Sequence, residues 1–178
     1  MPDESHRRAP GPALATRRRP RVAVRPATLK DLDAVAAMRV ALLREEERNP
    51  LFADPHPDAE ARALSLTRAE LEMTDQVVLL ATRGQEAIGM LRCRAVRRTP
   101  LVTEARQAVV TTAYVMPSER RGGVMRALLA GADRWCRKHH LAGMRLQCAL
   151  SNEIGRKAWE SLGFEPAEVL YVRDVPRD

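Results

Sequence analysis

The stretch VMPSERRGGVMRALL, residues 115–129, joins an apolar segment to an amphipathic one through a basic turn. The apolar segment, residues 108–116, predicts a buried β-strand. After Gly122 and Gly123, apolar residues recur at helical spacing with charged residues on the opposite side, which predicts a helix over 123–139. The chain therefore runs from a strand through a glycine turn into the start of a helix.

This turn has the properties of an anion site. The start of a helix carries backbone N–H groups without acceptors and the positive end of the helix dipole. Glycines let the backbone approach a ligand closely, and Arg120 and Arg121 add positive charge beside it. Neither GxxxxGK[ST] nor GxGxxG occurs here, so the turn predicts a phosphate or pyrophosphate site outside the two common nucleotide motifs.

The turn resembles the coenzyme A loop of the GNAT-type N-acetyltransferase superfamily, which reads [QR]xxGx[GA] shortly after a strand ending in Val-x-Pro. Here Val115-Met116-Pro117 precedes a segment that reads RRGGVM over 120–125. Arg120 and Gly123 match the pattern, whereas Met125 stands where Gly or Ala is usual. The segment NEIGRKAWESLGF, 152–164, resembles the later signature of the family: an Asn, a helix, an aromatic residue and Gly-Phe.

The length of 178 residues is enough for one domain with a real core, expected over 21–178. Residues 1–20 are rich in Arg and Pro and predict a disordered basic tail. Of the net charge of +7, residues 1–21 contribute +4, so the domain is only mildly basic. An aromatic content of 3% argues against a nucleic-acid partner, and no apolar run reaches the roughly 18 residues of a membrane span.

Three cysteines without CxxC spacing predict small buried side chains in a reducing compartment, and hence a cytoplasmic location. The elements predict the order β-α-α-β-β-β-α-β-α-β. The expected strands cover 22–25, 76–82, 87–94, 108–116, 144–150 and 169–175, and the expected helices cover 28–48, 58–73, 123–139 and 153–162. The fold class is α/β with three layers: a mixed, mostly antiparallel sheet with helices on both faces. The resemblance implies that the parallel strands 108–116 and 144–150 splay apart.

The resemblance also implies a coenzyme site between those two strands. The pantetheine arm would pair with the backbone near Val115, which would act catalytically by polarising the thioester carbonyl. Asn152 would contact the same arm, although a helix N-cap explains an Asn at this position equally well. The residues implied in coenzyme binding are Val115, Arg120, Arg121, Gly122, Gly123, Val124, Met125, Arg126 and Asn152.

The proton-transfer groups depart from the family pattern. Trp159 occupies the position where many relatives carry an acidic Tyr, and an indole N–H is only a hydrogen-bond donor. No Asp or Glu occurs in 108–118, and strand alternation from Val115 makes Thr111 the polar side chain facing the substrate. A base would then come from water or from one of four carboxylates, of which Glu46 is the choice as a substrate-lining residue: Glu45, Glu46, Glu47 and Glu104.

The resemblance thus implies an N-acetyltransferase that moves the acetyl group of acetyl-CoA to a primary amine of a small molecule or protein, without a metal. The alternative from another class is a non-catalytic acyl-CoA-binding sensor or regulatory domain, which Met125 and Trp159 favour. A third reading is a nucleic-acid module that uses the Arg-rich tail. A homodimer is compatible with the sequence.

Overall fold

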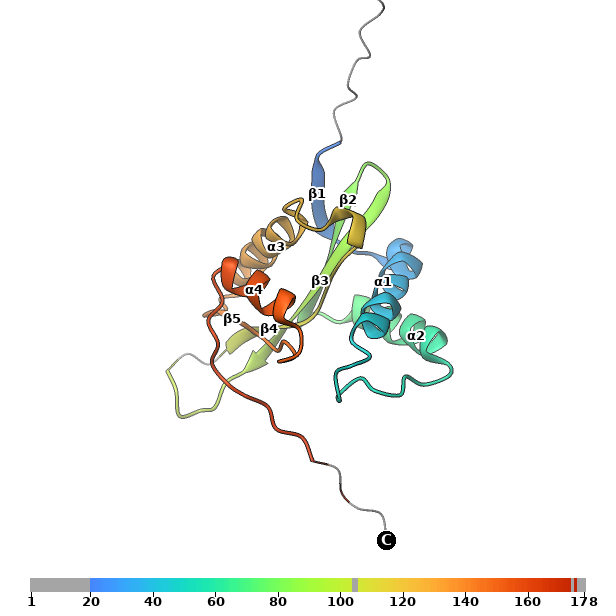
Figure 1. Cartoon of the computed structure of the whole chain (residues 1–178). Helices are drawn as coiled ribbons and strands as arrows, with labels where there is room; N and C mark the ends of the chain where they lie inside the picture. The colour runs from blue at the N-terminus through green and yellow to red at the C-terminus, as the bar shows by residue number, and fades with distance from the viewer. Residues whose placement is uncertain (1–19, 104–105, 174, 176–178) are drawn as a thin grey trace, which may run out of the picture.

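The computed structural model describes residues 20–103, 106–173 and 175, which form one sheet with helices on both faces (Figure 1). The strand order is β1-β2-β3-β4-β5. The first four strands pair antiparallel, and β4 pairs with β5 in parallel. The predicted mixed, mostly antiparallel sheet is confirmed. The strands are β1 Val22–Pro26, β2 Gln76–Arg83, β3 Glu86–Arg97, β4 Arg106–Val115 and β5 Met144–Leu146.

Two helices cover each face of the sheet, α1 and α2 on one side and α3 and α4 on the other (Figure 1). The buried core on the α3 side includes Leu91, Cys93 and Leu128, and the core on the α1 side includes Val35 and Met90. The bounds are α1 Leu32–Glu45, α2 Ala59–Glu72, α3 Val124–Lys138 and α4 Glu153–Ser161, with short 3-10 turns η1 Leu29–Asp31 and η2 Pro117–Glu119.

A capping box formed by Thr28 and Asp31 precedes α1. The Thr28 N–H donates to Asp31 Oδ2 at 2.8 Å, which satisfies a backbone donor before the helix. Arg25 holds the same carboxylate with two hydrogen bonds of 2.7 Å. In α2 the buried face is formed by Ala63, Thr67 and Glu70, whereas Leu64 is exposed.

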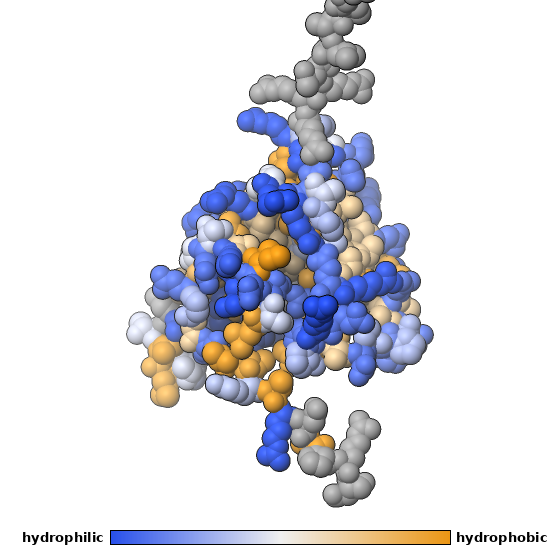
Figure 2. Space-filling view, viewed as in Figure 1, coloured by the Kyte–Doolittle hydropathy of each residue, from blue (hydrophilic) through white to orange (hydrophobic). Residues whose placement is uncertain are grey.

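Two predicted strands are corrected by the structure. β5 ends at Leu146 instead of 150, and no strand is assigned within the described part of 169–175. Val169, Leu170 and Val172 are each more than half exposed, and Figure 2 shows orange side chains where this segment leaves the domain. Their β-branched and apolar character predicted a strand, but strand preference needs cross-strand neighbours, and no described strand lies beside this segment.

The last helix and the cysteines complete the fold. α4 packs against the core through Trp159, while Ile154 and Ala158 are exposed. No residue of this nine-residue helix is fully buried. Cys93 and Cys136 are buried as predicted, and burial raises the pKa of the Cys93 thiol to about 12. Among the described residues, no helix is long and apolar enough to cross a membrane.

Candidate functional site

The turn before α3 presents a row of backbone donors. Gly123 is the N-cap of α3 with φ 77°, and Arg121 is also left-handed with φ 62°. The first helical bond runs from Ala127 N–H to the Gly123 carbonyl. The three preceding N–H groups, 124–126, therefore have no intrahelical acceptor. A Cβ placed on Gly123 would meet no heavy atom within 4 Å, so the backbone is open to a ligand on this side.

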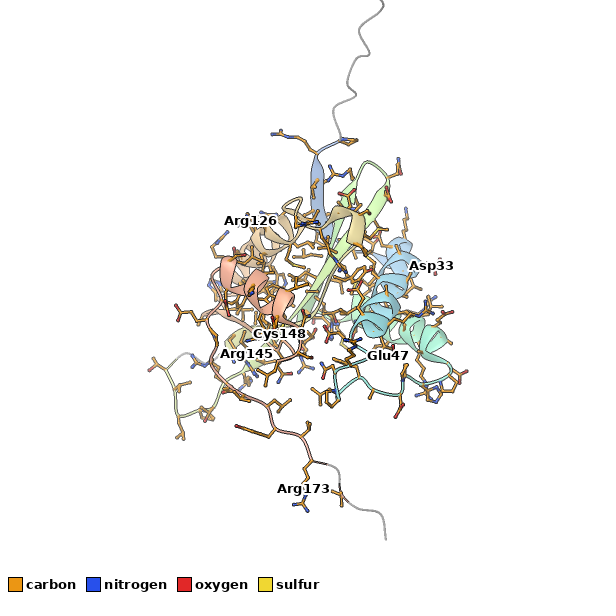
Figure 3. All side chains as sticks on the ribbon, in the orientation of Figure 1. Asp33, Glu47, Arg126, Arg145, Cys148 and Arg173 are labelled. Carbon is orange, nitrogen blue, oxygen red and sulfur yellow. The ribbon has the colours of Figure 1, made fainter. Side chains whose placement is uncertain are left out.

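The core fixes the direction of these donors. Val124 is 1% exposed and packs against the sheet together with Leu128. Met125 is half-buried and packs against the same core, so its side chain lies along the apolar side of the helix, as its flexibility allows. Arg126, labelled in Figure 3, is exposed at the start of α3. The residue that departs from the family pattern is thus accommodated in the helix stripe.

Arg120 points toward α1. Its Nη2 lies 2.6 Å from both carboxylate oxygens of Glu45, and its Nε donates to the Val115 carbonyl at 2.9 Å. Its guanidinium also lies 5.6 Å from the centre of the Tyr114 ring. Burial raises the pKa of the Tyr114 phenol, and the nearby Glu45 carboxylate raises it further. The Arg120 guanidinium therefore joins the end of α1 to the end of β4.

The parallel strands separate as the family resemblance implied. β4 and β5 pair over only three positions, ending at Val110 and Leu146. β4 continues to Val115, which pairs on its other side with Gly89 of β3. From 111 to 115, the β5 side of β4 has no strand beside it within the described chain. Unpaired strand backbone offers hydrogen bonds to an extended ligand.

The end of α1 meets the start of α4. Asn152 donates from Nδ2 to Glu46 Oε1 at 3.0 Å, and its Oδ1 accepts from the Gly155 N–H at 2.7 Å. The N-cap role left open by the sequence is therefore confirmed. Figure 3 shows the end of α1, marked by Glu47, facing the connection from β5 to α4, marked by Cys148. A cavity of about 220 Å³ is lined here by Glu45, Glu46, Arg48, Asn49, Ser151 and Asn152.

Glu46 faces this junction and forms no ion pair with any residue that the structure describes. Asn49 Nδ2 donates to Glu46 Oε2 at 3.3 Å, so both side-chain donors to this carboxylate are neutral amides. Burial raises the pKa of the Cys148 thiol and the charge of Glu46 raises it further, while the charge of Arg156 opposes this shift.

Thr111 sits at an irregularity of β4 that the sequence did not reveal. Arg92 pairs with Thr112 and Cys93 with Val110, so Thr111 is the extra residue of a bulge. Its Oγ1 accepts from Arg92 Nη1 at 3.0 Å. Simple alternation from Val115 therefore does not fix the face of Thr111, which the structure places with Arg92.

Arg92, the hydrogen-bond partner of Thr111, belongs to a buried ionic group that the sequence did not predict. Glu70 of α2 is 4% exposed and contacts both Arg92, at 3.0 Å, and Arg39 of α1. Gln76 accepts two further hydrogen bonds from Arg92. Burial lowers the pKa of the Arg92 guanidinium, and the Glu70 carboxylate opposes that shift. Only the helical spacing of Glu70 from the buried Thr67 could have indicated this group.

Of the other candidates for proton transfer, Glu45 also lines the cavity but its carboxylate is paired with Arg120, whereas Trp159 and Glu47 are not among the lining residues. Trp159 is half-buried and packs edge-on against Phe164 at 5.5 Å between ring centres, which favours a core role. Glu47 is exposed, and Glu104 lies outside the described residues. Within the described chain, no group of three or more His, Cys, Asp or Glu side chains could hold a metal ion.

The turn, the separated strands and the capped α4 together define a GNAT acetyltransferase fold. Residues 40–164 match the model of the Acetyltransferase (GNAT) family, and the chain belongs to that family. It is an acetyl-CoA-dependent N-acetyltransferase that acetylates an amine. The sensor alternative is thereby disfavoured.

Several proteins that this chain resembles in sequence or fold are aminoglycoside acetyltransferases. The chain is 30% identical over 128 residues to aminoglycoside N(6')-acetyltransferase type 1 of Acinetobacter haemolyticus, covering 71% of this chain and 86% of the relative. Its fold is similar to that of aminoglycoside N-acetyltransferase AAC(6')-Iy in complex with CoA, with a TM-score of 0.71, 21% identity and coverage of 89% and 97%. The fold is also similar to that of an aminoglycoside 6'-N-acetyltransferase from A. haemolyticus. The TM-score is 0.69 and the identity 24%, with coverage of 88% of this chain and 99% of that chain.

Proposed function

We propose that this enzyme acetylates a primary amine of a small, amine-rich molecule. The observation that carries the proposal is the placement of Glu46, whose carboxylate lines the cavity between α1 and α4. Within the described residues, its side-chain hydrogen-bond donors are the neutral amides of Asn49 and Asn152. A carboxylate without a cationic partner attracts an ammonium group. The curated relative named for aminoglycosides supports an acceptor of this class.

The turn before α3 would hold the pyrophosphate of acetyl-CoA. The N–H groups of 124–126 and the exposed side chains of Arg121 and Arg126 provide donors and positive charge, and the open side of Gly123 leaves room for the anion. The unpaired side of β4 up to Val115 would receive the pantetheine arm. Acetyl-CoA supplies an activated acetyl thioester, and the Val115 backbone would orient its carbonyl.

Glu46 would accept the proton of the acceptor ammonium group. The amine attacks only in its neutral form, so a carboxylate beside the cavity has to take this proton directly or through a water. Asn152 would fix the orientation of that carboxylate through its 3.0 Å hydrogen bond. No residue is assigned as the acid for the departing thiol, because a thiolate is a good leaving group and positioning alone supplies much of the rate.

Thiol release from acetyl-CoA with a panel of amines tests this proposal. The panel contains aminoglycosides, a linear diamine, a monoamine and a lysine-containing peptide. We expect the highest kcat/KM with multiply charged small amines and a loss of about 100-fold in Glu46→Gln, the lower end of what a general base contributes. Glu47→Gln, an exposed carboxylate next in sequence, is the matched control. A preference for the peptide, or full activity in Glu46→Gln, would overturn the assignment.

A further inference from the structure

The Arg120 guanidinium joins the end of α1 to the end of β4 through three contacts. It contacts the Glu45 carboxylate at the end of α1, the Val115 carbonyl at the end of β4, and the face of the Tyr114 ring. Glu45 and Arg120 are separated by 75 positions in sequence, so this contact is a tertiary restraint. The side chains remain 40% and 44% exposed, which leaves them open to substitution without emptying the core.

This placement sets Arg120 apart from the other arginines of the turn. Its charge is balanced by Glu45, whereas Arg121 and Arg126 are exposed and make no ion pair within the described residues. An arginine held by a carboxylate contributes less to an external anion than one that is free. Positive charge for a bound anion therefore comes from Arg121, Arg126 and the backbone donors.

The turn needs such a restraint because its own local contacts are few. Neither η2 nor α3 has a side-chain hydrogen bond at its N-cap. Arg121 adopts a left-handed conformation that costs roughly 1–2 kcal/mol for a residue with a Cβ. On one side, Glu119 of η2 is held by Arg83 of β2 at 2.8 Å. On the other side, Arg120 is held by Glu45.

We propose that Glu45 is a positioning residue that acts through Arg120. By holding the guanidinium against the Val115 carbonyl, it fixes the end of β4 and the turn that leads into α3. Because Glu46 follows directly in the chain, the last turn of α1 sets the acceptor cavity and the coenzyme turn relative to one another. The inference rests on the proposed function in one respect, namely that this turn binds coenzyme A.

Calorimetric titration of acetyl-CoA and steady-state kinetics on Glu45→Gln, Arg120→Gln and the double variant test the pair. We expect each single variant to weaken binding about fivefold, the equivalent of roughly 1 kcal/mol for a well-formed exposed pair, and the double variant to be no worse than either. kcat should fall in the same variants because Val115 loses its restraint. Glu60→Gln, which breaks the exposed 2.9 Å pair between α1 and α2, is the matched control and should change neither quantity.

The opposite role for Arg120 gives a different pattern. If its guanidinium contacted the anion directly, Glu45→Gln would release it and leave binding unchanged or tighter, while Arg120→Gln alone would lose affinity and lower the salt dependence. That pattern, or additive losses in the double variant, would overturn the inference. A wild-type protein that failed to bind acetyl-CoA would instead contradict the proposed function, so the two failures are distinguishable.

Discussion

Asn152 and Glu46 are joined by a 3.0 Å hydrogen bond that connects the start of α4 to the end of α1. The same amide caps α4 through its oxygen, so both of its ends are occupied. One side chain therefore fixes a helix start and the direction of the proposed base. A substitution that keeps the cap but alters the contact with Glu46 separates the two roles.

Asn152→Asp is that substitution. An Asp caps the helix as well as Asn does, but its carboxylate would face that of Glu46 at hydrogen-bond distance. We expect the free energy of unfolding to fall by about 1–2 kcal/mol at pH 7, and by less at pH 4, where carboxylates protonate. The double variant Asn152→Asp with Glu46→Gln should recover the loss. Denaturant unfolding at both pH values measures this change. A free energy of unfolding equal to that of the wild type for Asn152→Asp at pH 7 would contradict the contact.

Gly89 gives a prediction on packing. A Cβ at this position would lie 2.9 Å from the Tyr114 carbonyl oxygen and 3.3 Å from Val124 Cγ1. Because overpacking costs roughly 1–3 kcal/mol, Gly89→Ala should lower Tm by about 3–10 °C and displace Val115, its partner in β4. Gly143→Ala, where a Cβ meets nothing within 4 Å, is the control for differential scanning calorimetry. Equal melting temperatures of the two variants would refute the close approach.

Met125→Ala should lower the stability of the fold while it raises the affinity for coenzyme A. Since Met125 is half-buried, we expect a loss of about 2 kcal/mol, the low end for Met→Ala in a core. Removing the longer side chain from beside the coenzyme turn should tighten coenzyme A binding modestly. Leu128→Ala, on the same helix and fully buried, should lose more stability without any gain in affinity. Weaker binding of Met125→Ala at unchanged stability would mean that Met125 contacts the coenzyme.

Asp31 predicts a pH dependence of stability. The hydrogen bond from Arg25, aided by the Thr28 N–H, holds the pKa of this carboxyl far below its ordinary value. A depressed pKa stabilises the fold above the unfolded-state value near 3.9, and the contribution is lost as pH falls below it. The difference in unfolding free energy between wild type and Asp31→Asn should therefore be largest near pH 7 and shrink toward pH 3. Asp33→Asn, which removes an exposed carboxyl from the first turn of α1, is the control for the loss of one negative charge at this helix start.

The sequence predicted what local pattern determines. Periodicity placed β1 to β4 and the four helices close to their observed bounds, whereas β5 ends before the predicted strand does. The glycine turn and the cap at Asn152 were recognised because each depends on a few adjacent residues.

Features that depend on distant partners were not predictable. The pairing of Arg120 with Glu45, and of Glu70 with Arg92, brings together residues from different elements. The bulge at Thr111 depends on the register of β4 against β3. The expected strand at 169–175 had the right composition, but a strand requires a neighbouring edge, which composition does not report.

The central claim, that the turn before α3 binds coenzyme A through its backbone, is tested most directly by calorimetric titration of coenzyme A into Gly123→Val. A β-branched side chain at φ 77° would stand on the open side of the turn. Gly84→Val, at φ 64° in the β2–β3 turn and equally free of neighbours, carries the same backbone cost of roughly 1–3 kcal/mol away from the site. We predict that the Kd for coenzyme A is at least tenfold higher in Gly123→Val than in the wild type and unchanged in Gly84→Val. Wild-type affinity in a folded Gly123→Val would contradict the claim.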